Sequence, residues 1–339
     1  MLPINHNGGA GQLASPITLD DRFVPAVLAL VCLASGWGSN IYQTQSFVMV
    51  IAAFCALGFI LSDRIIAAVV VYLSIWYMAL FAGTTTEPAV IASSLHLVTA
   101  ALVVYAAVRL GTWGLDRHLD VILSVSCILA ALGIVGYLTG RPAVATLGNQ
   151  NFLGAFLAIG AFSAFRKKRA RYLTLILPAL WFCSSSTPIA AFCAGLGFYL
   201  WRWKGVSLGV ILGALYFFTI DNGSLIHTDR VDFWLDAWTQ VSASPWTLIF
   251  GMGPGVLWNP GVNMLHSEYA YLLWNLGGLG LLLAALYIRR AFRVVSDPIL
   301  AAMLVAVLVD AIGNHLFHTV PTALLAVAVF ALNDRTLEA

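Results

Sequence analysis

Charged residues are scarce in this sequence: Asp, Glu, Lys and Arg make up 9% of its 339 residues, whereas hydrophobic residues make up 60%. A soluble globular chain carries roughly a quarter of its residues as charged side chains, so this chain cannot cover itself with a solvated surface. Its net charge is only +2, and no basic block is suited to nucleic acid. The mean hydropathy of +0.89 therefore predicts an all-α integral membrane protein that crosses the bilayer several times.

Cysteine pairs at CxxC spacing and the sequence pattern of a cleavable signal peptide are also absent. Its five cysteines all lie in apolar segments without CxxC spacing, which excludes a disulfide framework or a thiolate metal site. The N-terminus has neither the positive start nor the apolar run of a signal peptide. We therefore expect residues 1–23 to form a polar cytoplasmic tail before the first membrane span.

Long apolar segments recur through the rest of the sequence. A helix needs about 20 apolar residues to cross a hydrocarbon core of about 30 Å. Residues 24–332 contain no internal repeat or low-complexity linker, so we expect a single polytopic membrane domain, followed by a tail at 333–339. The stretch 221–268 is too polar to span and predicts one large external loop. The roughly twelve predicted transmembrane helices are 24–41, 46–62, 65–83, 88–108, 119–139, 152–165, 172–184, 188–201, 206–220, 269–288, 298–313 and 319–332.

Basic residues are divided unevenly between the two faces that these spans define. Cytoplasmic loops retain Lys and Arg, so the basic cluster at 166–171 is expected inside. Threading the chain from there places 15 of its 17 Lys and Arg residues, and both termini, on the cytoplasmic side. Only Arg141 and Arg230 fall on the external face. Each is either a surface arginine in a loop or part of an external anion site, since a planar guanidinium suits phosphate.

The large loop contains an expected amphipathic helix. In the segment TDRVDFWLDAW, apolar residues recur at helical spacing at Val231, Trp234, Leu235 and Trp238. Tryptophan favours the headgroup level of a membrane, so we expect this helix to lie on the membrane surface. Simple anchoring is the favoured role of its tryptophans.

A glycine-rich turn and a histidine follow this helix. Gly251, Gly253 and Gly255 lack side chains and allow the close approach of a ligand or of another segment. His266 and Glu268 then stand where the chain re-enters the membrane. A histidine can act as a general base because its pKa is ordinarily near neutrality. A hydrogen-bonded interfacial residue is the simpler interpretation of His266.

Two more polar groups are expected on the external side. The segment GNQN at 148–151 follows Arg141, and its amides either cap a helix or hydrogen-bond a polar substrate. Asn314, His315 and His318 lie between the last two spans. The spacing of the two histidines is compatible with a metal pair, which we do not expect.

Four motifs follow one another along the chain, all on the predicted external side. They are GNQNFLGAFL at 148–157, Arg-x-x-x-Trp at 230–234, GMGPG at 251–255 and HSEYAYLLWNLGGLG at 266–280. Together they resemble the O-antigen ligase and polymerase superfamily, which are bacterial membrane glycosyltransferases that use undecaprenyl-linked glycans. The resemblance extends over residues 140–290, and over the preceding part of the chain by topology alone.

The resemblance implies a GT-C-like helical fold in the bacterial inner membrane, with the active face in the periplasm. It implies transfer of a glycan from undecaprenyl pyrophosphate to a hydroxyl of a glycan, lipid or protein, with inversion and without a metal or cofactor. By this resemblance His266 activates the acceptor hydroxyl, Arg230 holds pyrophosphate, and Arg141 is a second arginine by position alone. The expected substrate-binding residues are Asn149, Asn151, Trp234, Gly253, Glu268, His315 and His318.

Two positions depart from the family pattern. Where the family often has a Ser-Arg pair, residues 183–188 read CSSSTP, with no arginine. Ser267 follows the histidine where Asn is usual. The first departure removes an expected phosphate contact near Ser186, for which Arg141 is the expected substitute, and a divergent or inactive member of the family is the alternative.

A transporter or flippase for a lipid-linked or small polar substrate is the main alternative function. A transporter should carry ionisable residues in mid-span along its path. Here the predicted spans contain little beyond His96 and Asp310, whereas polar residues collect on one external face. That distribution favours catalysis at the surface. A non-catalytic scaffold is the third alternative, and it would leave His266 and the external arginines unexplained.

Overall fold

The structure is a computed structural model in which every described element is helical. It describes residues 105, 108, 114–166, 169–219, 229–252, 267–314, 316 and 320–335. The α-helices are α5 (Leu115–Leu138), α6 (Gln150–Gly160), α7 (Leu173–Phe182), α8 (Ser186–Trp201), α9 (Trp203–Thr219), α10 (Asp229–Ser242), α11 (Pro245–Phe250), α12 (Glu268–Val294), α13 (Pro298–Gly313) and α14 (Val320–Arg335). Short 3₁₀ segments at Ala161–Phe165 and Ala170–Tyr172 join α6 to α7.

The last eight predicted spans each coincide with a described helix. The first four, at 24–41, 46–62, 65–83 and 88–108, lie outside the described residues apart from two isolated positions. Two helices, α5 with 24 residues and α12 with 27, are long and apolar enough to cross a membrane by themselves. The other apolar helices have 10–17 residues. An all-helical fold is therefore confirmed for the described residues, and the number of twelve membrane spans stays a prediction.

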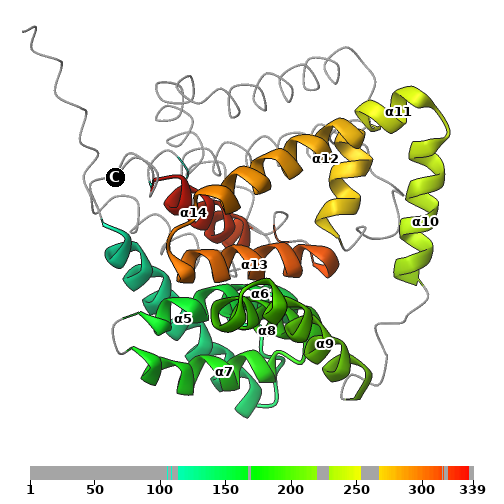
Figure 1. The fold of residues 1–339 in the computed structure, drawn as a ribbon. Helices are drawn as coiled ribbons and strands as arrows, with labels where there is room; N and C mark the ends of the chain where they lie inside the picture. The colour runs from blue at the N-terminus through cyan, green and yellow to red at the C-terminus, as the bar shows by residue number, and fades with distance from the viewer. Residues whose placement is uncertain are drawn as a thin grey trace, which may run out of the picture.

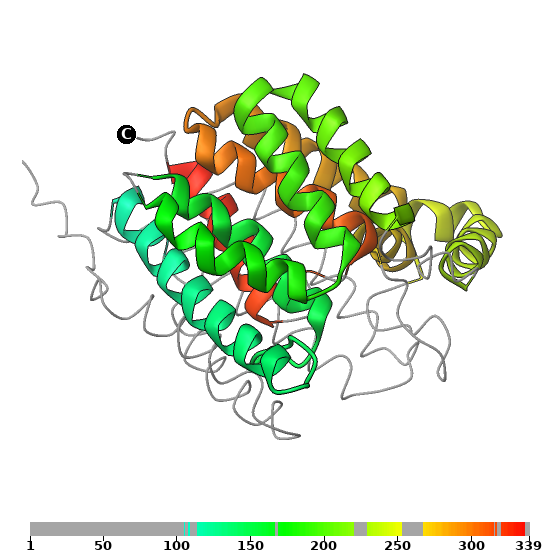
Figure 2. The same ribbon diagram turned by 90° about the horizontal axis from the view of Figure 1, so that it is seen from below.

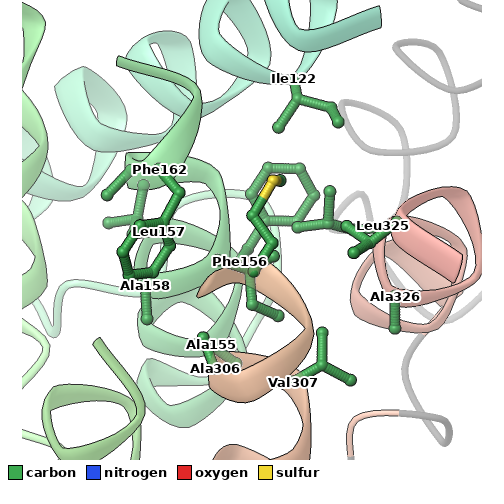
Figure 3. Packing of buried hydrophobic residues seen from close by; sticks show 14 of the residues in the cluster. Ile122, Ala155, Phe156, Leu157, Ala158, Phe162, Ala306, Val307, Leu325 and Ala326 are labelled. Atoms are coloured by element: carbon green, nitrogen blue, oxygen red, sulfur yellow. The ribbon is translucent and has the colours of Figure 1, made fainter. Parts of the chain in front are cut away.

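Helix α6 lies at the centre of the bundle. Every residue from Leu153 to Gly160 is buried. Figure 3 shows neighbours of this helix from α5, α13 and α14, and α7 and α8 pack against it as well. Phe156 and Phe162 are the largest side chains in this core that are almost completely enclosed, and small residues such as Ala155 and Ala306 let the backbones approach. Small residues at helix contacts are typical of membrane bundles, where packing rather than water exclusion holds helices together.

One end of the bundle is held by ion pairs of Arg166. Its Nε donates to Asp116 at the start of α5 at 2.8 Å, and its guanidinium also pairs with Asp297. Asp297 in turn caps α13 by accepting from the backbone N–H of Ile299 at 2.8 Å. Partial burial opposes the charge on Arg166, but the hydrogen bonds that it donates to these carboxylates and their negative charge outweigh this and raise the pKa of Arg166. Three segments distant in sequence therefore meet at the end that contains the predicted cytoplasmic cluster.

The ends of α12 and α14 belong to the same end of the bundle. The Nδ2 of Asn333 donates to the carbonyl oxygen of Ala291 at 3.0 Å, and Asn333 is fully buried. The arginines expected inside at 289–293 and 335 therefore lie at this end with Arg166. Helices α10 and α11 lie elsewhere, at the far end of the bundle from the start of α5 (Figure 1, Figure 2).

We predict that Arg166→Gln lowers the free energy of unfolding by about 1–3 kcal/mol, because it removes charge-assisted hydrogen bonds to two carboxylates on different helices. Thermal unfolding of the purified protein in detergent measures the change. Arg171→Gln is the matched control, since Arg171 is exposed and its side chain contacts that of the next residue, Tyr172. An equal loss in both variants would show that the ion pairs do not hold the bundle.

Candidate functional site

The predicted site residues fall into three groups in the structure. Asn149, Asn151, Arg141, Trp234 and Glu268 are described with their side chains. For Arg230 only the helical backbone is described. Gly253 and the three histidines, His266, His315 and His318, lie outside the described residues. The site is therefore built from the residues that flank these positions at the end of the bundle opposite Arg166, which we call the external end.

The segment GNQN forms the N-terminus of α6. Asn149 has an extended backbone, and its side-chain oxygen accepts from the N–H of Asn151 at 2.7 Å. This is the geometry of an N-cap, which satisfies a backbone donor that the helix leaves unpaired. Gly148, with a φ of 70°, makes the turn that precedes the cap. The capping interpretation is thus confirmed for Asn149, whose side chain remains at the exposed surface.

A buried amide and carboxylate tie this helix start to α13. The Nδ2 of Asn314 donates to the carbonyl oxygen of Asn151 at 3.2 Å and to Oδ2 of Asp310, also at 3.2 Å. Asp310 is completely buried and Asn314 is 2% exposed. In the sequence, Asp310 stands out only as an isolated ionisable residue in a predicted span. Its position one helical turn before Asn314 is the signal that could have placed it in the site.

Glu268 joins the same polar group from α12. It lies in the first turn of that helix, is 5% exposed, and is close enough to Asp310 for their carboxyl groups to interact electrostatically. Tyr269 secures the contact, because its hydroxyl donates to the carbonyl oxygen of Leu308 in α13 at 3.0 Å. The structure therefore brings together Asn151 and Glu268, two predicted substrate-binding residues that are 117 positions apart in the sequence.

The start of α8 borders this group as well. A carbon added at Gly313 would lie 2.9 Å from Oγ1 of Thr187, and one added at Gly154 would lie 2.8 Å from the ring of Pro188. Ser186 is 5% exposed beside them. The segment CSSSTP, which departs from the family pattern, thus contacts the external ends of α6 and α13 closely, at a place where only small residues fit.

The amphipathic helix expected in the segment TDRVDFWLDAW is present as α10, and the role of its stripe as a membrane anchor stays a prediction. Ala237 and Val241 are buried against Trp274 of α12. Leu235 and Trp238, which we placed in the anchoring stripe, are 58% and 50% exposed. Helix α10 runs across the direction of α13 at the external end (Figure 1). The exposed stripe therefore faces away from the protein, while a neighbouring row of smaller residues packs on α12.

Helix α12 was predicted as a continuous span at 269–288, and that is wrong at one point. Gly277 has a φ of 66° and interrupts the helix. The part before Gly277 runs beside α10, and the part after it turns along the bundle (Figure 1). The break frees the carbonyl oxygen of Trp274, which accepts from the N–H of Met252 at 2.7 Å.

The first glycine of the GMGPG turn fits into this break. Gly251 has a φ of 79°, and a carbon added to it would lie 2.5 Å from the backbone of Asn275 and 2.6 Å from the nitrogen of Gly277. The two glycines therefore bring the short helix α11 into backbone contact with α12. The close approach of another segment, one of two uses predicted for this turn, is confirmed at Gly251. Met252 and Ser267 stand at the two ends of the segment that contains His266. Met252 donates its N–H to Trp274 of α12, and Ser267 caps the N-terminus of α12.

The two external arginines lie on elements with different neighbours. Arg141 is exposed in the turn after α5, where Ala143 accepts a hydrogen bond from the thiol of Cys183 beside α7, at 3.8 Å. Arg230 belongs to α10, which packs against α11 and α12. A pyrophosphate clamp formed jointly by these arginines stays a prediction.

Across the described ranges, no group of three or more His, Cys, Asp or Glu side chains gathers where it could hold a metal ion. Comparison of the chain with protein-family profiles, with curated proteins and with solved structures finds no match. The geometry of the external end, together with the sequence motifs, is therefore the basis for a functional proposal.

We predict that Gly277→Ala and Gly251→Ala each lower the free energy of unfolding by at least about 2 kcal/mol. Both glycines adopt a backbone conformation that is costly for other residues, by about 1–3 kcal/mol, and an added carbon meets backbone atoms. Gly278→Ala is the control, because its added carbon would lie 3.4 Å from the nearest atom, an ordinary contact. Thermal unfolding compares the three. Similar melting temperatures for Gly277→Ala and Gly278→Ala would contradict the backbone contact.

Proposed function

We propose that this protein transfers a glycan from undecaprenyl pyrophosphate to an acceptor hydroxyl on the periplasmic face of the bacterial inner membrane. The reaction is inverting and needs no metal. The acceptor oxygen bonds to the anomeric carbon of the donor glycan, the bond from that carbon to the pyrophosphate oxygen breaks, and the hydroxyl proton passes to a base. Undecaprenyl pyrophosphate leaves with the bonding electron pair.

The observation that carries this proposal is the polar group of Asn151, Glu268, Asp310 and Asn314 at the external end. Ionisable residues buried in an apolar bundle are costly and mark functional positions. These four come from three helices, and Glu268 lies two residues after His266 in the sequence. Arg166, from the basic cluster expected in the cytoplasm, pairs with Asp297 at the other end of α13, which has 16 residues and is about 24 Å long.

In this proposal His266 accepts the proton of the acceptor hydroxyl and Arg230 binds the pyrophosphate. A sugar hydroxyl is a poor nucleophile, and a positioned base contributes about 10²–10⁴-fold to the rate. Departure of pyrophosphate develops negative charge, which a preorganised guanidinium stabilises. Arg141 assists on the same face. Asn149, Asn151 and Glu268 hydrogen-bond the glycan hydroxyls, with Trp234 beside them.

Transport of a lipid-linked substrate is the second candidate, and Asp310 favours it as a buried ionisable residue in a membrane-type helix. Its place in α13 counts against that role. Asp310 is three residues from the end of the helix and is hydrogen-bonded to Asn314 beyond it. A carboxylate at the external end suits a surface reaction better than a path through the bundle.

We predict that His266→Ala reduces glycan transfer at least about 10²-fold while the protein stays folded, because the acceptor loses its base. Glu268→Ala is the matched comparison, and transfer should fall less in it. Arg230→Ala should weaken donor binding, and Arg230→Lys should recover only part of it because Lys lacks the two-pronged geometry. Transfer from a purified lipid-linked donor in nanodiscs measures all four. Near-normal turnover in His266→Ala would contradict the role of His266 as the base.

We also predict that both termini and the 166–171 cluster face the cytoplasm. A single cysteine at position 168 or 335, in a cysteine-free background, should resist a membrane-impermeant maleimide in intact cells. A cysteine replacing Arg141 should react, since that residue is exposed at the external end. Labelling of position 168 from outside would reverse the topology and remove the active face from the periplasm.

A further inference from the structure

The amide of Asn314 occupies a junction between three helix ends. Its nitrogen has two hydrogens, one for the carbonyl oxygen of Asn151 at 3.2 Å and one for the carboxylate of Asp310 at 3.2 Å. The carboxyl oxygens of Asp310 accept from the nitrogen of Asn314, so Asp310 selects the orientation in which this nitrogen points toward α6. The carbonyl oxygen of Asn151 can accept this bond in addition to its helical bond, because it has two lone pairs.

The same carboxylate is also the link to α12. Asp310 interacts electrostatically with Glu268, and the adjacent Tyr269 is hydrogen-bonded to Leu308, half a turn before Asp310. The start of α6 and the start of α12 therefore both contact the same turn of α13. These two helix starts carry the residues proposed to contact the glycan.

We propose that Asn314, oriented by Asp310, is a positioning residue that sets the start of α6 against the start of α12 so that the acceptor glycan binds to Asn151 and Glu268. This inference rests on the proposed function and adds to it the residue pair that determines acceptor affinity. Neither Asn314 nor Asp310 needs to touch the reacting atoms. Their effect reaches the acceptor through the positions of the two helix starts.

The chain offers a matched control for Asn314. Asn333 is another fully buried asparagine whose Nδ2 donates across helices to a backbone carbonyl, that of Ala291, at 3.0 Å. It lies at the opposite end of the bundle. Replacing either asparagine by alanine removes a buried hydrogen bond to a backbone carbonyl of another helix, and Asn314→Ala also removes the hydrogen bond to Asp310.

The experiment compares wild type, Asn314→Ala and Asn333→Ala as full-length protein in nanodiscs, with kcat and the KM for the acceptor measured separately. We expect Asn314→Ala to raise the acceptor KM about tenfold, because small displacements of binding groups are costly. Asn333→Ala should leave this KM within about twofold of wild type. A structural role alone would lower the active fraction, and with it kcat, without changing KM. An equal acceptor KM in the two variants would overturn the inference while wild-type turnover still supports the proposed function.

A conservative variant tests the part played by Asp310. Asp310→Asn keeps an oxygen that accepts from Asn314 and should keep the acceptor KM within about threefold of wild type, whereas Asp310→Ala should resemble Asn314→Ala. If Asn314→Ala does not fold, Asn314→Ser replaces it, and its single hydroxyl hydrogen can satisfy only one of the two partners. A folded Asn314→Ser with a wild-type KM would contradict the inference.

A second measurement does not depend on glycan transfer. Glu268 is 5% exposed, so a water-soluble carbodiimide with an amine should label it slowly in wild type. Labelling, followed by peptide mass spectrometry, should rise severalfold in Asn314→Ala and stay unchanged in Asn333→Ala. If wild type transfers no glycan but labelling responds in this way, the proposed reaction fails and the positioning of Glu268 stands. Unchanged labelling in Asn314→Ala would refute the positioning.

Discussion

The hydrogen bonds at the two ends of α13 hold the bundle in register. Apolar packing is strong but not directional, so α6, whose core face is made of Ala, Leu and Phe, could slide against its neighbours at little cost. Asp297 with Arg166 at one end, and Asn314 with Asn151 at the other, prevent this. A buried polar group left without its partner costs about 1–3 kcal/mol, so displacement along the axis would carry that cost at Asn314 and would break the partly buried ion pairs of Arg166. The external site depends on this register, because its residues come from separate helices.

The break in α12 determines how the external loop sits on this frame. A continuous helix would have no unpaired carbonyl at Trp274 and no room for the backbone of α11. The break at Gly277 leaves this carbonyl oxygen free to accept and makes room for the backbone of α11, and Gly251 forms the turn that fits into the break. As a result α10 packs on the first part of α12 through Ala237 and Val241, and leaves Leu235 and Trp238 outward. Two glycines 26 positions apart thus place the helix that carries Arg230.

Much of this was predictable from local patterns, and the misses have one cause. Apolar length predicted eight described helices with boundaries within a few residues, and the amphipathic period predicted α10. The Asn149 cap followed from residue type and position. The break at Gly277 was missed because a glycine within an apolar run is tolerated in a helix and becomes a break only when a partner occupies it. Asp310 was undervalued for a similar reason, since its partners Asn151 and Glu268 are distant in the sequence.

The sequence by itself determined that this chain is helical and apolar, where its helices lie, and which end of the bundle receives its basic residues. Those properties come from composition and periodicity, which act within about 20 residues. Only the tertiary structure decided which face of α10 is buried, where α12 breaks, and that Asn151, Glu268, Asp310 and Asn314 meet. These depend on contacts between segments that are 26 to 163 residues apart, and such contacts exist only once the helices have packed together.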